Sequence, residues 1–171
     1  MENERTAKGC IIMRDTYPMK NIEALIRQKP RVFVYITLAY ILSIGLMKWV
    51  LHPSLDALWF FFGGAIGLYF LDAAEIFFAL IPSPFRSVVF SALFAAVAFF
   101  VVTSSSGTIG SGLVLSIYLQ MILWQAGEWR ISGHTDSWYR MVAGPVNQST
   151  QRALFVGFIV LFLLVSYLFI R

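Results

Sequence analysis

The sequence predicts an all-α, polytopic integral membrane protein, a bundle of about five transmembrane helices with its N-terminus in the cytoplasm and its C-terminus outside. Composition is the first reason: 58% of the 171 residues are hydrophobic and 13% are charged, against about 25% charged residues in a soluble domain. The second reason is a charge-free stretch from Ser87 to Gly127. One small core cannot bury this much apolar surface, so lipid is the expected solvent.

Two regions are predicted. Residues 1–30 form a polar cytoplasmic tail, and residues 31–171 form a single transmembrane domain. In the tail, Met19, Ile22 and Ile26 recur at helical spacing, which indicates a short amphipathic helix on the membrane surface. A flexible tail is the equally weighted alternative.

Clusters of proline, serine and glycine divide the apolar sequence into spans. His52-Pro53-Ser54 and Pro82-Ser83-Pro84 bound the second span. Ser104-Ser105-Ser106-Gly107 interrupts the charge-free stretch, which as one helix would be about twice as long as the hydrocarbon core is thick. The glycines that follow, up to Gly112, indicate a flexible hairpin. The spans expected are 31–51, 57–81, 85–103, 109–128 and 153–170.

The positions of lysine and arginine predict the orientation. If the N-terminus is cytoplasmic, only Lys48 and Arg171 lie on the outer side, and all other basic residues lie in the tail or at the inner ends of the spans. Cytoplasmic loops of membrane proteins carry such an excess of basic residues. Lys48 is close enough to the end of its span to reach the headgroup layer.

Two acidic residues lie within the second span. Asp72 and Glu75 are three residues apart and share a helix face. An ionisable group in hydrocarbon costs about 3 kcal/mol to insert, so each is expected to have a partner. The fourth span runs in the same direction and places polar side chains near the same side of the membrane. We therefore predict an intramembrane polar cluster with two possible counter-charges, Arg86 and Arg130, and five members: Asp72, Glu75, Gln120, Gln125 and Glu128.

This cluster has three interpretations. Carboxylates that face a bundle interior commonly mark a proton or cation pathway. Alternatively, the amides and Arg86 satisfy Asp72 and Glu75, and the cluster only sets the helix register. In the third interpretation, both acids lie near the interface of a locally thinned bilayer.

A stripe of small residues occupies another face of the second span. Gly63, Gly67 and Ala74 lie close together on the helical wheel, roughly opposite Asp72. The spacing of Gly63 and Gly67 is typical of closely packed membrane helices. The packing partner is expected from this chain or from a second copy. If Asp72 faces inward, the stripe faces a partner protein instead.

The polar loop after the fourth span contains His134 and Asp136, two residues apart. Such a pair can serve acid–base or metal chemistry. Without a third ligand, and in an apparently irregular loop, we predict that they are ordinary loop residues. Four apolar side chains are expected to anchor the loop in the headgroup layer: Trp138, Tyr139, Met141 and Val142.

The motif content excludes several classes of protein. The single cysteine, Cys10, excludes a disulfide framework and a cysteine-based zinc site. Phosphate-loop, intramembrane hydrolase and metalloprotease signatures are missing from the sequence. We therefore predict no catalytic residue, no metal, no cofactor and no nucleic-acid partner.

The favoured function is a non-enzymatic membrane component that scaffolds or stabilises a larger assembly. Its partners would be the lipid bilayer and a membrane protein or a second copy, and its expected location is the plasma (inner) membrane. One alternative is a small proton- or cation-coupled permease or channel that uses Asp72 and Glu75. Another is a lipid-modifying membrane enzyme.

Overall fold

The computed structural model is a helix bundle that describes residues 30–51, 53, 55–78, 84–104, 107–142 and 146–171. The amphipathic helix predicted in the tail lies outside these residues. The α-helices are α2 (Arg31–Leu51), α3 (Asp56–Phe77), α4 (Val88–Ser104), α5 (Thr108–Ser132) and α6 (Gln148–Ile170), and a 3₁₀ helix, η1 (Asp136–Tyr139), lies between the last two. The prediction of an all-α bundle is confirmed.

Four of these helices, α2, α3, α5 and α6, are long and apolar enough to cross a membrane. The fifth, α4, is also apolar and has 17 residues. At 1.5 Å per residue it is about 26 Å long, slightly less than the ~30 Å hydrocarbon core. The helices therefore have the length and composition of an integral membrane protein.

Two of the helix ends that differ from the prediction carry caps, one a glycine C-cap and one an asparagine N-cap. The first span matches α2 at both ends. The fourth was expected to end at Glu128, but α5 continues to Ser132 and ends at Gly133, whose φ of 74° suits glycine. The fifth was expected to begin at Ala153. Instead α6 begins at Gln148, because the Asn147 side chain accepts the Ser149 N–H at 3.3 Å.

The predicted break in the charge-free stretch is confirmed, but the flexible hairpin is not. α4 ends at Ser104, and Gly107 is the N-cap of α5. Gly110 and Gly112 lie inside α5, so the prediction of a flexible segment up to Gly112 was wrong. Gly112 lies within this helix because α5 packs tightly against α3 at that point.

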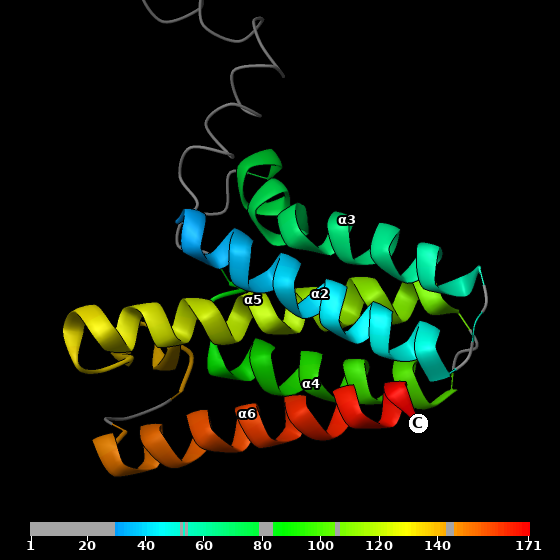
Figure 1. The fold of residues 1–171 in the computed structure, drawn as a ribbon. Helices are drawn as coiled ribbons and strands as arrows, with labels where there is room; N and C mark the ends of the chain where they lie inside the picture. The colour runs from blue at the N-terminus through cyan, green and yellow to red at the C-terminus, as the bar shows by residue number, and fades with distance from the viewer. Residues whose placement is uncertain (1–29, 52, 54, 79–83, 105–106, 143–145) are drawn as a thin grey trace, which may run out of the picture.

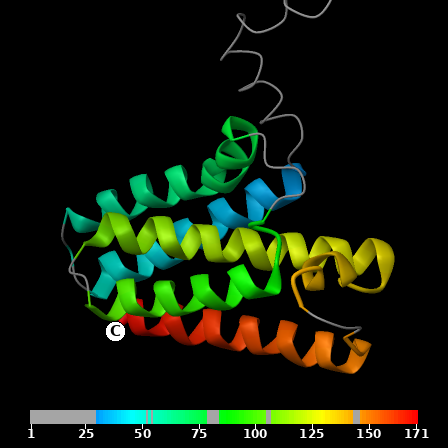
Figure 2. The ribbon, with the colours of Figure 1, turned by 180° about the vertical axis from the view of Figure 1, so that it is seen from behind.

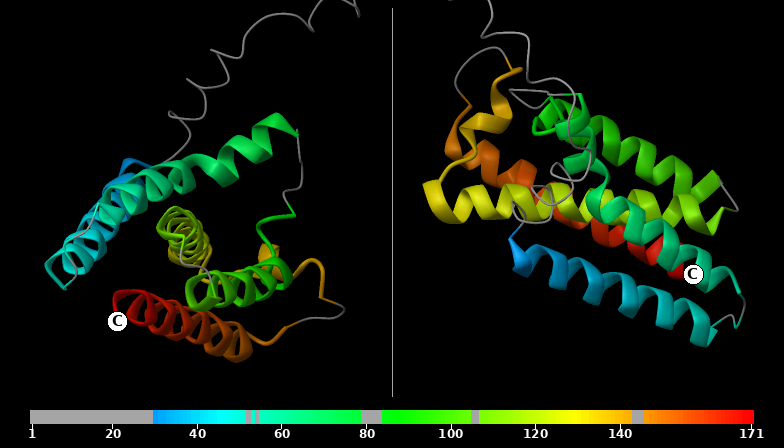
Figure 3. Two further views of the ribbon diagram at one scale, coloured as in Figure 1. Left: turned by 90° about the vertical axis from the view of Figure 1, so that its right-hand side faces the viewer. Right: turned by 90° about the horizontal axis from the view of Figure 1, so that it is seen from above.

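Successive helices run antiparallel, and α5 occupies the centre (Figures 1 and 2). Viewed from the end, α2 and α3 lie on one side of α5, and α4 and α6 on the other (Figure 3). The apolar stretch of α5 is 72% buried, against 17% for that of α2. α5 is therefore the helix around which the others pack.

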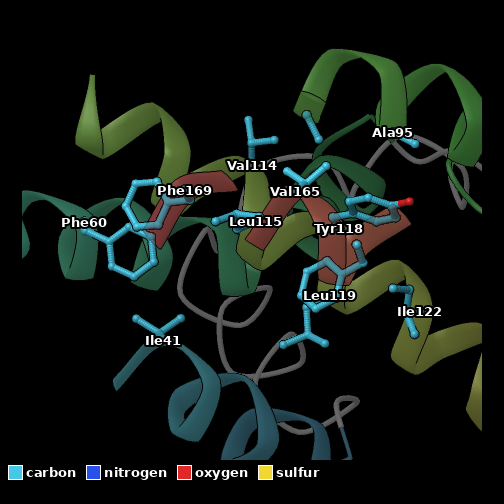
Figure 4. Close-up of a cluster of buried hydrophobic side chains, with 12 residues drawn as sticks. Ile41, Phe60, Ala95, Val114, Leu115, Tyr118, Leu119, Ile122, Val165 and Phe169 are labelled. Atoms are coloured by element: carbon cyan, nitrogen blue, oxygen red, sulfur yellow. The ribbon is translucent and has the colours of Figure 1, made fainter. Parts of the chain in front are cut away.

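Aromatic side chains fill the core between α3, α5 and α6 (Figure 4). Phe60 stacks on Phe169 with ring centroids 4.7 Å apart, and Tyr118 meets Phe162 edge-on at 5.4 Å. The Tyr118 hydroxyl donates to the Phe158 carbonyl at 3.1 Å. The core thus buries large rings and leaves the hydroxyl satisfied.

The predicted glycine stripe packs against α5 within the chain. A Cβ on Gly63 would lie 2.1 Å from the Ile109 carbonyl oxygen, and one on Gly67 would lie 1.9 Å from the Ser116 hydroxyl. The reverse contact comes from Gly112, where a Cβ would lie 2.2 Å from the Phe60 carbonyl oxygen. The two backbones meet so closely that only glycine fits. Gly63 and Gly67 therefore face α5 and not a partner protein, so that alternative was wrong for these two residues.

Candidate functional site

Five arginines of the described part of the chain gather at one end of the bundle. This is the end where α2, α4 and α6 begin and where α3 and α5 finish. Among the described residues, only Lys48 and Arg171 of the basic side chains lie at the other end. The arginines of the first end are Arg31, Arg86, Arg130, Arg140 and Arg152.

Lys48 contacts the end of α6. Its ammonium donates to the Phe169 carbonyl at 2.7 Å and lies 4.8 Å from the centre of the Phe169 ring. A cation at a helix C-terminus satisfies a free carbonyl and complements the helix dipole. Lys48 therefore joins the first and last helices of the described chain.

Glu75 pairs with Arg86, one of the two predicted counter-charges. The Arg86 Nε donates to Glu75 Oε1 at 3.0 Å and its Nη2 donates to Oε2 at 2.7 Å, a bidentate ion pair. The Glu75 side chain is 16% exposed and that of Arg86 39%. The guanidinium also lies 4.1 Å from the centre of the Trp124 ring, which Phe33 meets edge-on. The pair thereby ties the end of α3 to α5.

The two predicted glutamines bind hydroxyls on different helices. Gln120 donates to the Thr37 hydroxyl of α2 at 2.6 Å, and Gln125 donates to the Ser91 hydroxyl of α4 at 3.4 Å. Both glutamines are buried. Gln120 Oε1 has no hydrogen-bond partner among the residues described. These amides hold α5 to its neighbours on opposite sides.

Glu128 binds the loop that follows its own helix. The Ser137 hydroxyl donates to Oε1, and the Trp138 indole N–H donates to Oε2 at 2.8 Å. Trp138 and Tyr139 are buried, and burial raises the pKa of Tyr139. Of the predicted headgroup anchors, Met141 and Val142 are exposed, but Trp138 and Tyr139 are buried, so that prediction was wrong for these two aromatic residues.

The predicted cluster members thus bind several separate partners. Asp72 is half-buried on α3, as is Ala74, and Arg130 is exposed. Arg130 forms no ion pair within the described part of the chain. The hydrogen bonds above do not join Glu75, the two glutamines and Glu128 to one another. A helical wheel shows which side chains of one helix share a face, but not which neighbouring helix that face meets. In the folded bundle, each of these side chains meets a different neighbour.

The loop between α5 and α6 is ordered by a side chain that the sequence did not single out. Gln151 is buried, accepts from Thr135 N–H at 3.1 Å, and donates to Asp136 Oδ1 at 2.6 Å. The other oxygen of Asp136 lies 3.3 Å from His134 Nδ1. No group of three or more metal-ligating side chains occurs among the described residues. His134 and Asp136 therefore form a pair without a third ligand.

A cleft of about 610 Å³ opens at the arginine end. The start of α2 forms one side with Phe33, and the last turns of α5 form another from Trp124 to Ser132. Arg86 and the loop residues from His134 to Arg140 complete it. We take this cleft, rather than the predicted cluster, as the candidate site, because it brings charged side chains from three separate segments to one accessible space.

Sequence reasoning singled out Arg86 and Glu128 but did not place them in one cleft, because the rest of the cleft comes from the loop after α5. His134 and Asp136 were singled out, but Arg140 and Gln151 were not considered as site residues. Gln151 and Thr135 are far apart in the sequence, so their hydrogen bond could be seen only in the folded loop. Comparisons with protein-family models, with curated proteins and with solved structures find no match for this chain.

Proposed function

We propose that the protein is a non-enzymatic component of a plasma-type membrane, where its helix bundle supports a larger assembly. Its arginine end would face the cytoplasm, because basic residues remain on the side of synthesis. Phosphate-rich, anionic lipid surfaces on that side would hold the same residues.

One observation carries this proposal: polar groups within the spans are engaged in contacts inside the bundle. Glu75 is neutralised by Arg86, and Gln120 and Gln125 bind hydroxyls in helix seams. A conduction pathway needs polar groups that face water and exchange partners. Side chains that instead join helices to one another favour a structural role over transport.

Exposed apolar side chains supply the surface for such an assembly. Leu42 of α2 is 52% exposed, Leu58 of α3 is 62% exposed and Leu163 of α6 is 60% exposed. Lipid or a partner helix would cover them in the membrane.

Photo-crosslinking in native membranes tests this proposal. A photoreactive amino acid would replace Leu42, Leu58 or Leu163 in turn, each variant serving as control for the others. We expect a protein adduct of fixed mass from one face and lipid adducts from the others. Lipid adducts alone at all three positions would refute a scaffold.

A flux measurement tests the permease alternative with Asp72→Asn and Glu75→Gln. We expect proteoliposomes with the wild-type protein to conduct protons and monovalent cations no faster than empty liposomes. A flux that the folded Asp72→Asn variant loses would overturn the scaffold proposal in favour of transport.

A lipid-modifying enzyme is the second candidate, favoured by the contact between His134 and Asp136 beside the cleft. An aspartate that orients a histidine is a common arrangement for a general base. Release of a headgroup or acyl chain from phospholipid vesicles by the wild-type protein, and not by His134→Gln, would establish this alternative.

A further inference from the structure

Two guanidinium groups in the cleft have hydrogen-bond donors that no described residue uses. Arg140 is exposed and has no hydrogen bond or ion pair to any residue that the structure describes. Arg86 uses Nε and Nη2 for Glu75, which leaves Nη1 without a hydrogen bond to the described residues. Arginine presents five N–H donors and no acceptor. Two guanidinium groups therefore bring unused donors to the same space.

Both carboxylates of the cleft already have a partner at each oxygen. Glu128 accepts from Ser137 with one oxygen and from Trp138 with the other. Asp136 accepts from Gln151 with one oxygen, and its other oxygen lies against His134. Because each of these oxygens already has a contact within the protein, the two guanidinium groups supply donors that the carboxylates of the cleft do not use, although the formal charges of its lining cancel. Such a site suits a ligand rich in acceptors and negative charge.

Apolar side chains beside these donors indicate where the rest of the ligand lies. Phe33 and Trp124 form part of the wall, and Ile131, also at the cleft, is 89% exposed. The cleft lies at the end of the bundle, next to helices whose outer surfaces are apolar. An ion without hydrocarbon would leave this apolar wall uncovered.

We propose that the cleft binds the phosphate of an anionic phospholipid. Arg140 and the free Nη1 of Arg86 donate to the phosphate oxygens, and the glycerol and upper acyl carbons cover Phe33 and Ile131. Arginine is suited to phosphate because its planar fork donates two parallel hydrogen bonds. A phospholipid is a better occupant than free phosphate, since it alone uses both the donors and the apolar wall. This inference concerns the cleft only and does not depend on the scaffold proposal.

The test measures lipid binding to the full-length protein purified in a neutral detergent. Short-chain phosphatidic acid is titrated and bound lipid is counted by native mass spectrometry. Phosphatidylcholine with the same chains and glycerol phosphate without chains are titrated in parallel. We expect phosphatidic acid to bind at least tenfold more tightly than either, because a charge-assisted hydrogen bond is worth about tenfold in affinity or more.

Arg140→Gln is the decisive variant, and Arg130→Gln is its matched control. Both arginines are exposed at the same end of the bundle, but only Arg140 lines the cleft. We expect Arg140→Gln to weaken phosphatidic acid binding at least tenfold, Arg140→Lys to weaken it less, and Arg130→Gln to leave it within about twofold. The titration is repeated at 1 M salt, where charges are screened beyond about 3 Å.

Three results would overturn the proposal. Equal losses in Arg140→Gln and Arg130→Gln would mean general attraction to a basic surface. Equal binding of phosphatidylcholine would remove the preference for an anionic lipid. Glycerol phosphate that competes at the same concentration as the lipid would assign the cleft to a free phosphate compound.

Discussion

Substitution of Gly63 by alanine tests the close approach of α3 and α5. The new Cβ would lie 2.1 Å from the carbonyl oxygen and 2.9 Å from the carbonyl carbon of Ile109. Ordinary carbon–oxygen contacts are about 3.3–3.6 Å, so the two backbones would have to move apart by about 1.2–1.5 Å along this contact. A gap of 0.5–1 Å removes roughly a quarter to a half of the dispersion energy between facing atoms.

The magnitude follows from two opposing effects. Overpacking costs typically about 1–3 kcal/mol, and the upper end applies here because the obstructing atoms belong to the backbone and have no rotamer to change. Alanine also stabilises the helix by up to about 1 kcal/mol relative to glycine, because its helix propensity is higher. We therefore expect Gly63→Ala to lower the free energy of unfolding by about 2 kcal/mol.

The measurement is unfolding of the purified protein by SDS in mixed micelles, followed by tryptophan fluorescence. Gly157→Ala on α6 is the control, because a Cβ there would meet no atom within 4 Å. The control keeps only the propensity gain, so the two variants should differ by about 3 kcal/mol. If both variants unfold at the same SDS fraction, the glycine seam does not contribute to stability as argued.

The same unfolding assay checks three further expectations. Glu75→Gln should lower the free energy of unfolding by about 1 kcal/mol, because it removes the charge opposite the Arg86 guanidinium, which is partly exposed to solvent. A larger loss of stability at 1 M salt than at 0.1 M salt would contradict this expectation. Gln120→Met should be as stable as the wild type within about 1 kcal/mol. The substitution loses the hydrogen bond to Thr37, but it also removes a buried oxygen that has no hydrogen-bond partner among the described residues, and the two effects offset each other. A loss of stability above about 3 kcal/mol would show that the amide is essential. Burial raises the pKa of Tyr139, so the stability that this residue contributes is complete below the unfolded-state pKa of about 10 and is lost as the pH rises further. Tyr139→Phe should reduce the loss of stability at alkaline pH by this share, and an unchanged loss would contradict the expectation.

The fold was predictable to the extent that it depends on local sequence. Apolar length and the Ser104–Gly107 break determine the spans, and these signals lie within each segment. The ends of α5 and α6 were not predictable in the same way. Gly133 ends α5 because the backbone turns left-handed there, and Asn147 caps α6 from a loop that resembled any other polar stretch.

The candidate site was harder to predict because it depends on how helices rotate against one another. Residue types and spacing identified Glu75 and Arg86, which do form an ion pair. The wheel of a single helix could not show that Gln120 would turn to α2 and Gln125 to α4. Arg140 has no distinguishing sequence context, and only the folded loop brings it to the cleft.

The central position of α5 has a consequence for biosynthesis. α2 and α3 leave the ribosome well before α5, and the groove at Gly63 and Gly67 that receives α5 must therefore be occupied by acyl chains in the interval. A nascent chain that stops after α4 contains α2, α3 and α4. It lacks α5, which is the most buried of the membrane-spanning helices and supplies much of the hydrophobic core. Quality-control proteases would meet such a chain as helices without their central packing partner, until the part of α5 from Ile109 to Ser116 that contacts both glycines has been made.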